Sequence, residues 1–217
     1  MSCVLCHTRK EKRFCPAVHG RICPTCCGEQ REVTLDCPSD CPYLQQARRN
    51  ELPRPLEASE PELLFPDIEV PPQFLYEREP LIMGLSFAVS RAARVDRGLV
   101  DRDVISVLHN LAGSYHTRVN SGLVYETPLA AVPQQNLLAE LQKRIAEYRE
   151  MEQQHLGYSS LRDSDALRGI VFLLRMALAR TTGRPRSRAY VDFLFEQFPE
   201  KSGVVSPAQE PSRIIVP

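Results

Sequence analysis

The sequence predicts a mainly α-helical protein in which a small cysteine-rich module precedes a bundle of about five helices. Three observations indicate this fold class. All eight cysteines lie between residues 3 and 41, seven prolines lie between residues 53 and 80, and long apolar stripes at helical spacing follow from residue 81. A chain of 217 residues has room for one full domain and a small accessory module. We therefore expect a module at 1–52, a proline-rich strap at 53–80, a helical domain at 81–199 and a flexible tail at 200–217.

The cysteines of the module form close pairs of the kind that hold a metal ion. Gaps of two or three residues let both sulfur atoms of a tight turn reach one ion, as tetrahedral zinc requires at a Zn–S distance of about 2.3 Å. In a reducing compartment such a pattern favours metal ligands over disulfides. Four pairs predict two Zn²⁺ ions, each in a closed site with four ligands. The candidate ligands are Cys3, Cys6, Cys15, His19, Cys23, Cys26, Cys27, Cys37 and Cys41.

Two pairings of these ligands are compatible with the spacing. In a tandem arrangement neighbouring pairs share an ion, whereas in an interleaved arrangement the first pair joins the third and the second joins the fourth. The eight residues between Cys6 and Cys15 leave little chain for a separate finger, which favours interleaving. The two interleaved groups are Cys3, Cys6, Cys23 and Cys27, and Cys15, His19, Cys37 and Cys41. Since Cys26 and Cys27 are neighbours, one of them is either spare or a replacement for His19.

Other thiol chemistry fits the spacing less well. The intervals typical of ferredoxin iron–sulfur clusters are absent, and so is the βαβ pattern that accompanies a thioredoxin-like Cys-x-x-Cys. A catalytic zinc keeps an open position, whereas this module offers a full set of ligands. Structural zinc is therefore the preferred interpretation, and metal binding should supply the folding energy of a unit too small to bury enough apolar surface.

The order of the pairs, with Cys-x2-Cys first and Cys-x3-Cys later, resembles the cross-braced zinc modules of the MYND and HIT-finger type over residues 1–45. The sequence departs from those families at Cys15-x3-His19, where they usually carry Cys-x2-Cys, and at the last pair, where MYND modules carry a histidine. The segments CPAVHGRICPTCCGEQRE and CPSDCPYL also resemble a module in uncharacterised bacterial proteins with helical C-terminal regions. Both resemblances imply a structural zinc scaffold, which in MYND modules binds proline-containing peptides.

The charge balance bears on the kind of partner. The chain carries 27 basic and 27 acidic residues, which argues against a polyanion as the main partner. Residues 1–52 hold eight basic and six acidic residues, and bound zinc with its thiolates brings the module to about −1. We therefore expect much of the basic content to serve the thiolates as hydrogen-bond donors. No secretory signal and no long apolar run is present, so we expect a cytoplasmic protein without a membrane partner.

The segment between the module and the helical domain reads in two parts. Residues 42–52 lack helix breakers and predict a short helix, with Tyr43 and Leu44 packed on the module and Arg48 and Arg49 facing water. The prolines of the strap oppose regular helix. Its apolar residues predict an extended segment laid over one or both domains, with a short strand at 67–70 as one option.

Five helical segments are expected in the domain that follows: 81–93, a second capped by Asp101 or Asp103, a third that begins after Pro133 and runs to about 154, 163–181 and 187–198. The fourth is apolar around most of its circumference and should lie at the centre. Residues 116–119 and 123–126 predict a small hairpin around Asn120-Ser121-Gly122. The basic run 180–188 should be a loop that caps the fourth helix dipole or contacts phosphate. No catalytic motif stands out.

These observations favour a non-enzymatic, zinc-dependent binding or adaptor protein whose module engages a protein or peptide. The surface expected for this contact contains Phe14, Ile22, Val33 and Leu35, and the strap is a candidate ligand in cis. One alternative is a nucleic-acid-binding regulator that uses basic residues of 9–13 and 184–188. Another is an enzyme with a site between the helices, for which the sequence offers no residue.

Overall fold

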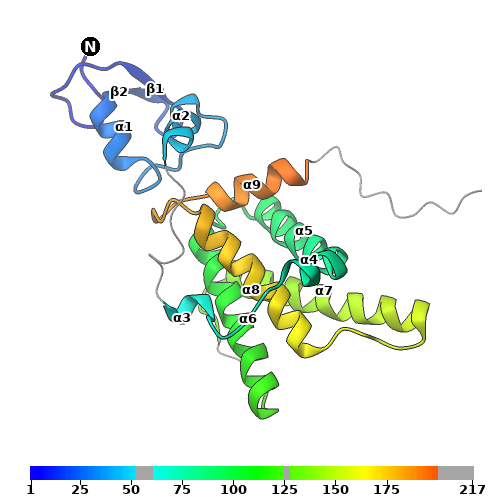
Figure 1. The fold of residues 1–217 in the computed structure, drawn as a ribbon. Helices are drawn as coiled ribbons and strands as arrows, with labels where there is room; N and C mark the ends of the chain where they lie inside the picture. The colour runs from blue at the N-terminus through cyan, green and yellow to red at the C-terminus, as the bar shows by residue number, and fades with distance from the viewer. Residues whose placement is uncertain (52–60, 125–127, 200–217) are drawn as a thin grey trace, which may run out of the picture.

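The computed structural model describes residues 1–51, 61–124 and 128–199, and its elements are predominantly helices. This confirms the mainly α fold class. Figure 1 shows the N-terminal segment, with β1, β2, α1 and α2, next to a larger body that contains α5 to α9. Among the described residues no helix is both long and apolar enough to cross a membrane.

The N-terminal segment contains a two-stranded hairpin and two short helices. Strand β1 (Arg13–Cys15) pairs antiparallel with β2 (Gly20–Ile22). Helices α1 (Pro24–Gln30) and α2 (Pro42–Asn50) each begin with proline directly after a cysteine. A proline at the first helical position lacks an N–H group where none is needed. The Cys-Pro steps of the sequence therefore fix where both helices begin.

The small core of this segment consists of cysteines and a few aliphatic side chains. Ile22 and Leu35 are buried in it, at 0% and 6% exposure, so the prediction that they face a partner is wrong. Phe14 and Val33 are exposed, as expected. Tyr43 packs against this core and Leu44 is buried, which agrees with the predicted role of the helix after Cys41.

The helical body is organised around α8 (Asp163–Arg180), which packs against α6 (Asp101–Ser121), α5 (Glu79–Val95) and α9 (Ala189–Gln197). Helix α7 (Val132–Leu156) covers α5 and α6. The buried residues of α8 lie around most of its circumference: Ala166, Leu167, Gly169, Ile170, Val171, Leu173, Leu174, Ala177 and Leu178. The expected central position of this helix is confirmed.

Helix α6 is longer than expected. It continues through residues 116–119 and ends at Gly122, which has φ 71°. A glycine in the left-handed conformation is a common helix C-terminus. The predicted hairpin is therefore wrong at its first flank, while its second flank, 123–126, falls partly outside the described residues.

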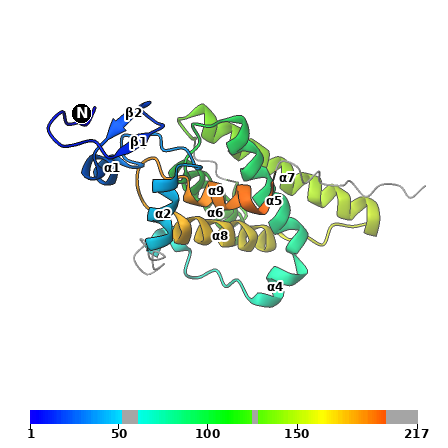
Figure 2. The ribbon, with the colours of Figure 1, turned by 90° about the horizontal axis from the view of Figure 1, so that it is seen from above.

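The described part of the strap, residues 61–80, packs against the helical body (Figure 2). This part contains two short helices, α3 (Pro61–Leu64) and α4 (Pro72–Glu77), and no strand at 67–70. Prolines at the start of each helix are tolerated because the first turn needs no N–H partner. Arg175 of α8 fastens the strap by donating hydrogen bonds to the carbonyl oxygens of Leu64, Phe65 and Ile68 at 3.0, 2.7 and 2.8 Å. For this part of the strap, docking on the module is ruled out.

Candidate metal centre

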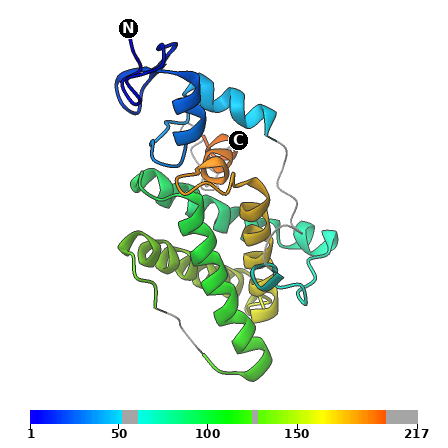
Figure 3. The same ribbon diagram turned by 90° about the vertical axis from the view of Figure 1, so that its left-hand side faces the viewer.

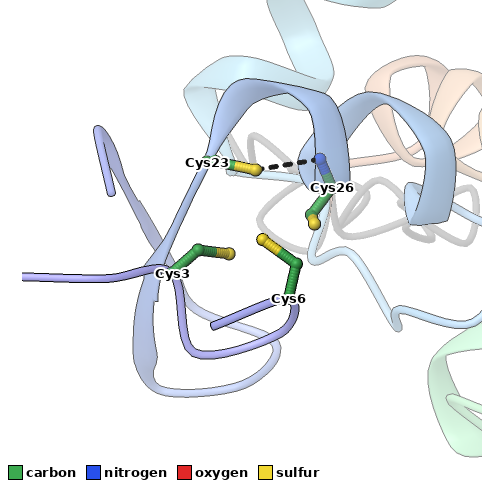
Figure 4. A group of neighbouring side chains, drawn as sticks. All are labelled: Cys3, Cys6, Cys23 and Cys26. Carbon is green, nitrogen blue, oxygen red and sulfur yellow. Dashed lines mark hydrogen bonds between the residues drawn. The ribbon is translucent and has the colours of Figure 1, made fainter. Parts of the chain in front are cut away.

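Four cysteines lie together at the N-terminal end of α1. The sulfur atoms of Cys3, Cys6, Cys23 and Cys26 are all within 4.8 Å of one another. Figure 4 shows the four side chains pointing toward a common point, two from the N-terminal loop and two from the start of α1. Tetrahedral zinc with Zn–S bonds of about 2.3 Å separates its sulfur ligands by about 3.8 Å. The group is therefore placed to hold one metal ion.

The local sequence explains why the first two sulfurs converge. The N–H of Cys3 donates to the carbonyl of Arg9 at 2.9 Å, and the N–H of His7 donates to the carbonyl of Cys3 at 2.8 Å. His7 itself has φ 56°, a left-handed conformation that closes the turn. Its side chain is exposed.

The fourth member of this group is Cys26, whereas the interleaved prediction assigns Cys27. The reason lies in the geometry of α1. Cys23 is the N-cap residue, and its sulfur accepts a hydrogen bond from the N–H of Cys26 at 3.4 Å. Cys27 is one residue further along, about 100° around the helix axis, and faces a different side. The first and third cysteine pairs thus lie together, as the interleaved arrangement predicts.

The pKa values of three of these thiols are shifted, and not all in the same direction. Hydrogen bonds from the Thr8 side chain and from the backbone of Arg9 and Thr8 lower the pKa of Cys6 to about 5. The hydrogen bond from the backbone N–H of Cys26 lowers the pKa of Cys23. In contrast, the pKa of Cys26 is raised to about 12 by the hydrogen bond between the Cys26 and Cys23 side chains, together with burial. The surroundings thus favour the thiolate at Cys6 and Cys23 and the thiol at Cys26, and a bound divalent ion would favour the thiolate form of its ligands.

A second set of cysteines surrounds a small cavity of about 10 Å³ on the other side of α1. Cys15 ends β1, Cys27 lies in α1, and Cys37 and Cys41 bracket the turn before α2. Burial raises the pKa of Cys37, and the nearby Cys15 and Cys41 sulfurs act in the same direction. Among the described residues only the first group has its ligand atoms within 4.8 Å of one another, so this second set is more open.

His19, the predicted histidine ligand, lies apart from both groups. It is exposed in the β1–β2 turn with φ 47°, and it does not line the cavity that Cys15, Cys37 and Cys41 share. Cys27 lines that cavity instead, which corresponds to the alternative in which a neighbouring cysteine replaces His19.

Glu32 is a buried residue that the sequence did not single out. It is 2% exposed and sits between α1 and Cys37 with φ 53°. Its two carboxylate oxygens accept hydrogen bonds from Arg48 Nη2 at 2.6 Å and from the Thr182 hydroxyl at 3.2 Å. Arg48 also pairs with Asp192 of α9 at 2.6 Å, so the prediction that this arginine faces water is wrong. Helical periodicity does not reveal a partner that lies 144 positions away.

These contacts belong to the junction between the N-terminal segment and the helical body. The basic run 180–188 makes a large part of this junction (Figure 3). Arg184 donates to the carbonyls of Gly28 and Arg31 at 3.2 and 2.8 Å. The backbone N–H of Arg186 donates to the carbonyl of Glu32 at 2.8 Å, and its side chain pairs with Asp36 at 2.5 Å. The predicted loop is thus present, and it binds the N-terminal segment.

Comparison of the chain with protein-family models, with curated proteins and with solved structures gave no significant match. The resemblance of residues 1–45 to cross-braced zinc modules therefore rests on the cysteine spacing alone.

Proposed function

We propose that residues 1–45 form a structural module with two Zn²⁺ ions in a cross-braced arrangement. Cys3, Cys6, Cys23 and Cys26 hold one ion, and Cys15, Cys27, Cys37 and Cys41 hold the other. The observation that carries this proposal is the group of four converging sulfurs, since four protein ligands leave zinc no open position for a substrate. Zinc is preferred because a tetrahedral all-cysteine set is its usual structural environment.

The surroundings of the sulfurs support this assignment. The pKa of Arg9 is raised, and the largest cause is its hydrogen bond to Cys23. Such a donor next to a thiolate is what a negatively charged zinc–cysteine centre needs from its second layer of residues. Arg13 lies over the ring of Tyr43 at 4.6 Å and covers the module from the α2 side. Arg9 and Arg13 thus have uses within the module.

On this basis we propose a non-enzymatic, zinc-dependent binding protein of the reducing cytoplasm, whose module engages a protein or peptide. Phe14 is the leading anchor: it is 55% exposed in β1, directly before the ligand Cys15. A large aromatic side chain held on a metal-braced strand loses little freedom when a partner covers it. The MYND resemblance suggests a proline-containing segment as the partner.

The nucleic-acid alternative is less well supported. Arg184 is engaged with the carbonyls of Gly28 and Arg31, and Arg9 with Cys23. Each guanidinium that is fixed in this way is less available to a phosphate backbone, on which non-specific nucleic-acid binding depends.

The test is binding of the zinc-loaded full chain to an array of proline-containing peptides. We expect binding that disappears on chelation and that Phe14→Ala weakens about tenfold. Tyr158→Ala, which removes a similarly exposed aromatic ring just after the C-terminal end of α7, is the matched control and should have no effect. Absence of any peptide binding, or binding that survives chelation, would contradict the proposed function. Retention on nucleic acid that falls steeply with salt would favour the alternative.

A further inference from the structure

A large cleft lies where the N-terminal segment meets the helical body. Its volume is about 880 Å³, within the range of sites for small ligands. One wall is the turn of residues 36–39, and the other comes from the end of α5, the loop before α6 and Phe195 of α9. The proposed peptide anchor Phe14 does not line this cleft, and Cys37 is the one proposed zinc ligand among its described lining residues.

The lining of the cleft is strongly basic. Arg94, Arg97, Arg186 and Arg188 face it, and Asp36 is the single acid among the described lining residues. The whole chain, in contrast, has equal numbers of basic and acidic residues. Positive charge that gathers in a concave site concentrates the field there and attracts anions.

The guanidinium group of Arg188 is held in place by neutral groups. Arg188 donates to the carbonyl oxygens of Ala93, at 3.3 Å, and of Arg97. Arg188 also lies over the ring of Phe195, at 5.9 Å. Carbonyl groups and an aromatic ring fix the orientation of a guanidinium without cancelling its charge.

Two further arginines of the cleft, Arg97 and Arg186, are accessible. Arg97 is exposed and forms no ion pair with any described residue. Arg186 pairs with Asp36, but the side chains are 43% and 81% exposed. An exposed ion pair contributes little in water, so an incoming anion with stronger charge competes with it readily.

We propose that this cleft binds a small molecule that carries two adjacent phosphate groups. The planar guanidinium fork matches phosphate oxygens with two parallel hydrogen bonds, and several such forks favour an anion of more than one charge. A small ligand fits better than a polynucleotide, because the basic residues form a bounded cleft instead of an extended stripe. Since Cys37 and Asp36 stand on one wall and Arg97 on the other, the ligand would bridge the two parts of the molecule.

The test is calorimetric titration of the zinc-loaded full chain with inorganic pyrophosphate near physiological ionic strength. We expect saturable binding with a Kd below about 1 mM. Arg97→Gln should weaken it about tenfold or more, since one charged donor is lost. Asp36→Asn should tighten it about threefold, because the variant releases Arg186 and removes the negative charge. A purely structural role of Arg97 and Asp36 would not make the two substitutions change the affinity for pyrophosphate in opposite directions.

Arg162→Gln is the matched control, because Arg162 is also exposed but lies at the opposite end of α8. It should leave the affinity unchanged. Tighter binding of ADP than of pyrophosphate would support the proposal and identify a nucleotide as the source of the phosphate groups. The proposal is overturned by a lack of saturable binding, by equal affinity in the Arg97 variant, or by tight binding of single-stranded nucleic acid that pyrophosphate does not displace.

Discussion

At the scale of single residues, the neighbouring Cys26 and Cys27 decide how the cysteines are shared. Successive residues of a helix point about 100° apart, so two adjacent cysteines do not easily serve one ion. Cys26 faces Cys3, Cys6 and Cys23, while Cys27 lines the cavity of the second set. One short helix therefore contributes to both groups, which is the physical basis of the proposed cross-brace.

This division predicts the effect of single substitutions on metal content. Cys27→Ser should lose one of the two zinc ions, and His19→Ala should lose neither, because the exposed imidazole lies outside the cavity. Metal analysis of the purified variants by inductively coupled plasma mass spectrometry checks both. If His19→Ala lost an ion while Cys27→Ser kept both, the second set of ligands would be the one that includes His19.

At the scale of helices, a buried carboxylate organises the start of α9. The sequence predicts that Asp101 or Asp103 caps α6, and Asp103 does so by accepting a hydrogen bond from the N–H of Val100 at 3.3 Å. Asp101 instead turns to α9 and accepts from the N–H groups of Tyr190 and Val191, both at 3.2 Å. It thereby supplies the cap that α9 lacks from its own N-cap residue.

The titration of Asp101 should be visible in the stability of the protein. Burial raises the pKa of its carboxyl group, despite the hydrogen bond from Ser187 and those from the backbone of α9. Its contribution to stability is therefore complete below the unfolded pKa of about 3.9 and is lost as the pH rises through the folded pKa. Asp101→Asn does not titrate. The difference in free energy of unfolding between wild type and this variant should narrow as the pH rises above about 4.

Urea denaturation of both proteins over this range measures that difference. Asp103→Asn, a carboxylate on the same helix turn with a half-buried side chain, is the control for a general effect of charge. A difference that widens with rising pH would mean that the folded state favours the carboxylate, contrary to the raised pKa.

The attachment of the strap gives a second prediction at this scale. Three carbonyl oxygens of the strap accept hydrogen bonds from Arg175. Arg175→Ala should lower the free energy of unfolding by about 2 to 4 kcal/mol, because several charge-assisted hydrogen bonds are lost. Hydrogen exchange in residues 61–70 should rise at the same time, whereas Arg162→Ala should change neither quantity. Unchanged exchange in that segment would show that its packing on the core, and not Arg175, holds the strap.

At the scale of the whole molecule, the junction couples the metal centres to the helical body. The segment that contacts the loop of residues 181–188 runs from Gly28 to Asp36, and thus lies between the proposed ligands Cys27 and Cys37. Binding of a metal ion at Cys27 and Cys37 would fix both ends of this segment. Loss of the metal should therefore unfold the module and also detach it from the helical body.

Glu32 provides the direct test of that junction. Glu32→Gln removes the charge from a buried carboxylate that faces Arg48, and should lower stability by about 2 to 4 kcal/mol. Hydrogen exchange should increase in residues 28–36 and 181–188 while the interior of α8 stays protected. Asp36→Asn, which breaks an exposed pair, should cost less than about 1 kcal/mol. Equal effects of the two substitutions would contradict a docked junction that depends on Glu32.

The sequence predicts local features of this molecule better than long-range ones. Helix positions follow from apolar spacing, and the starts of α1 and α2 follow from Cys-Pro steps. Short turns, in contrast, leave no periodic pattern in the sequence. They determine that Cys26 joins the first group, that His19 lies apart from both groups, and that β1 and β2 form a hairpin. The roles of Glu32, Arg48 and Arg184 depend on partners about 150 residues away, which spacing within one segment does not reveal.

The central claim is that sulfur-bound zinc holds the first 45 residues in shape. Native mass spectrometry of the full chain, purified under reducing conditions, tests it most directly. We predict two zinc ions per chain, with all eight cysteines free of disulfides. A chain that carries one ion would refute the second centre, and a metal-free chain with its cysteines joined in disulfides would contradict the whole account.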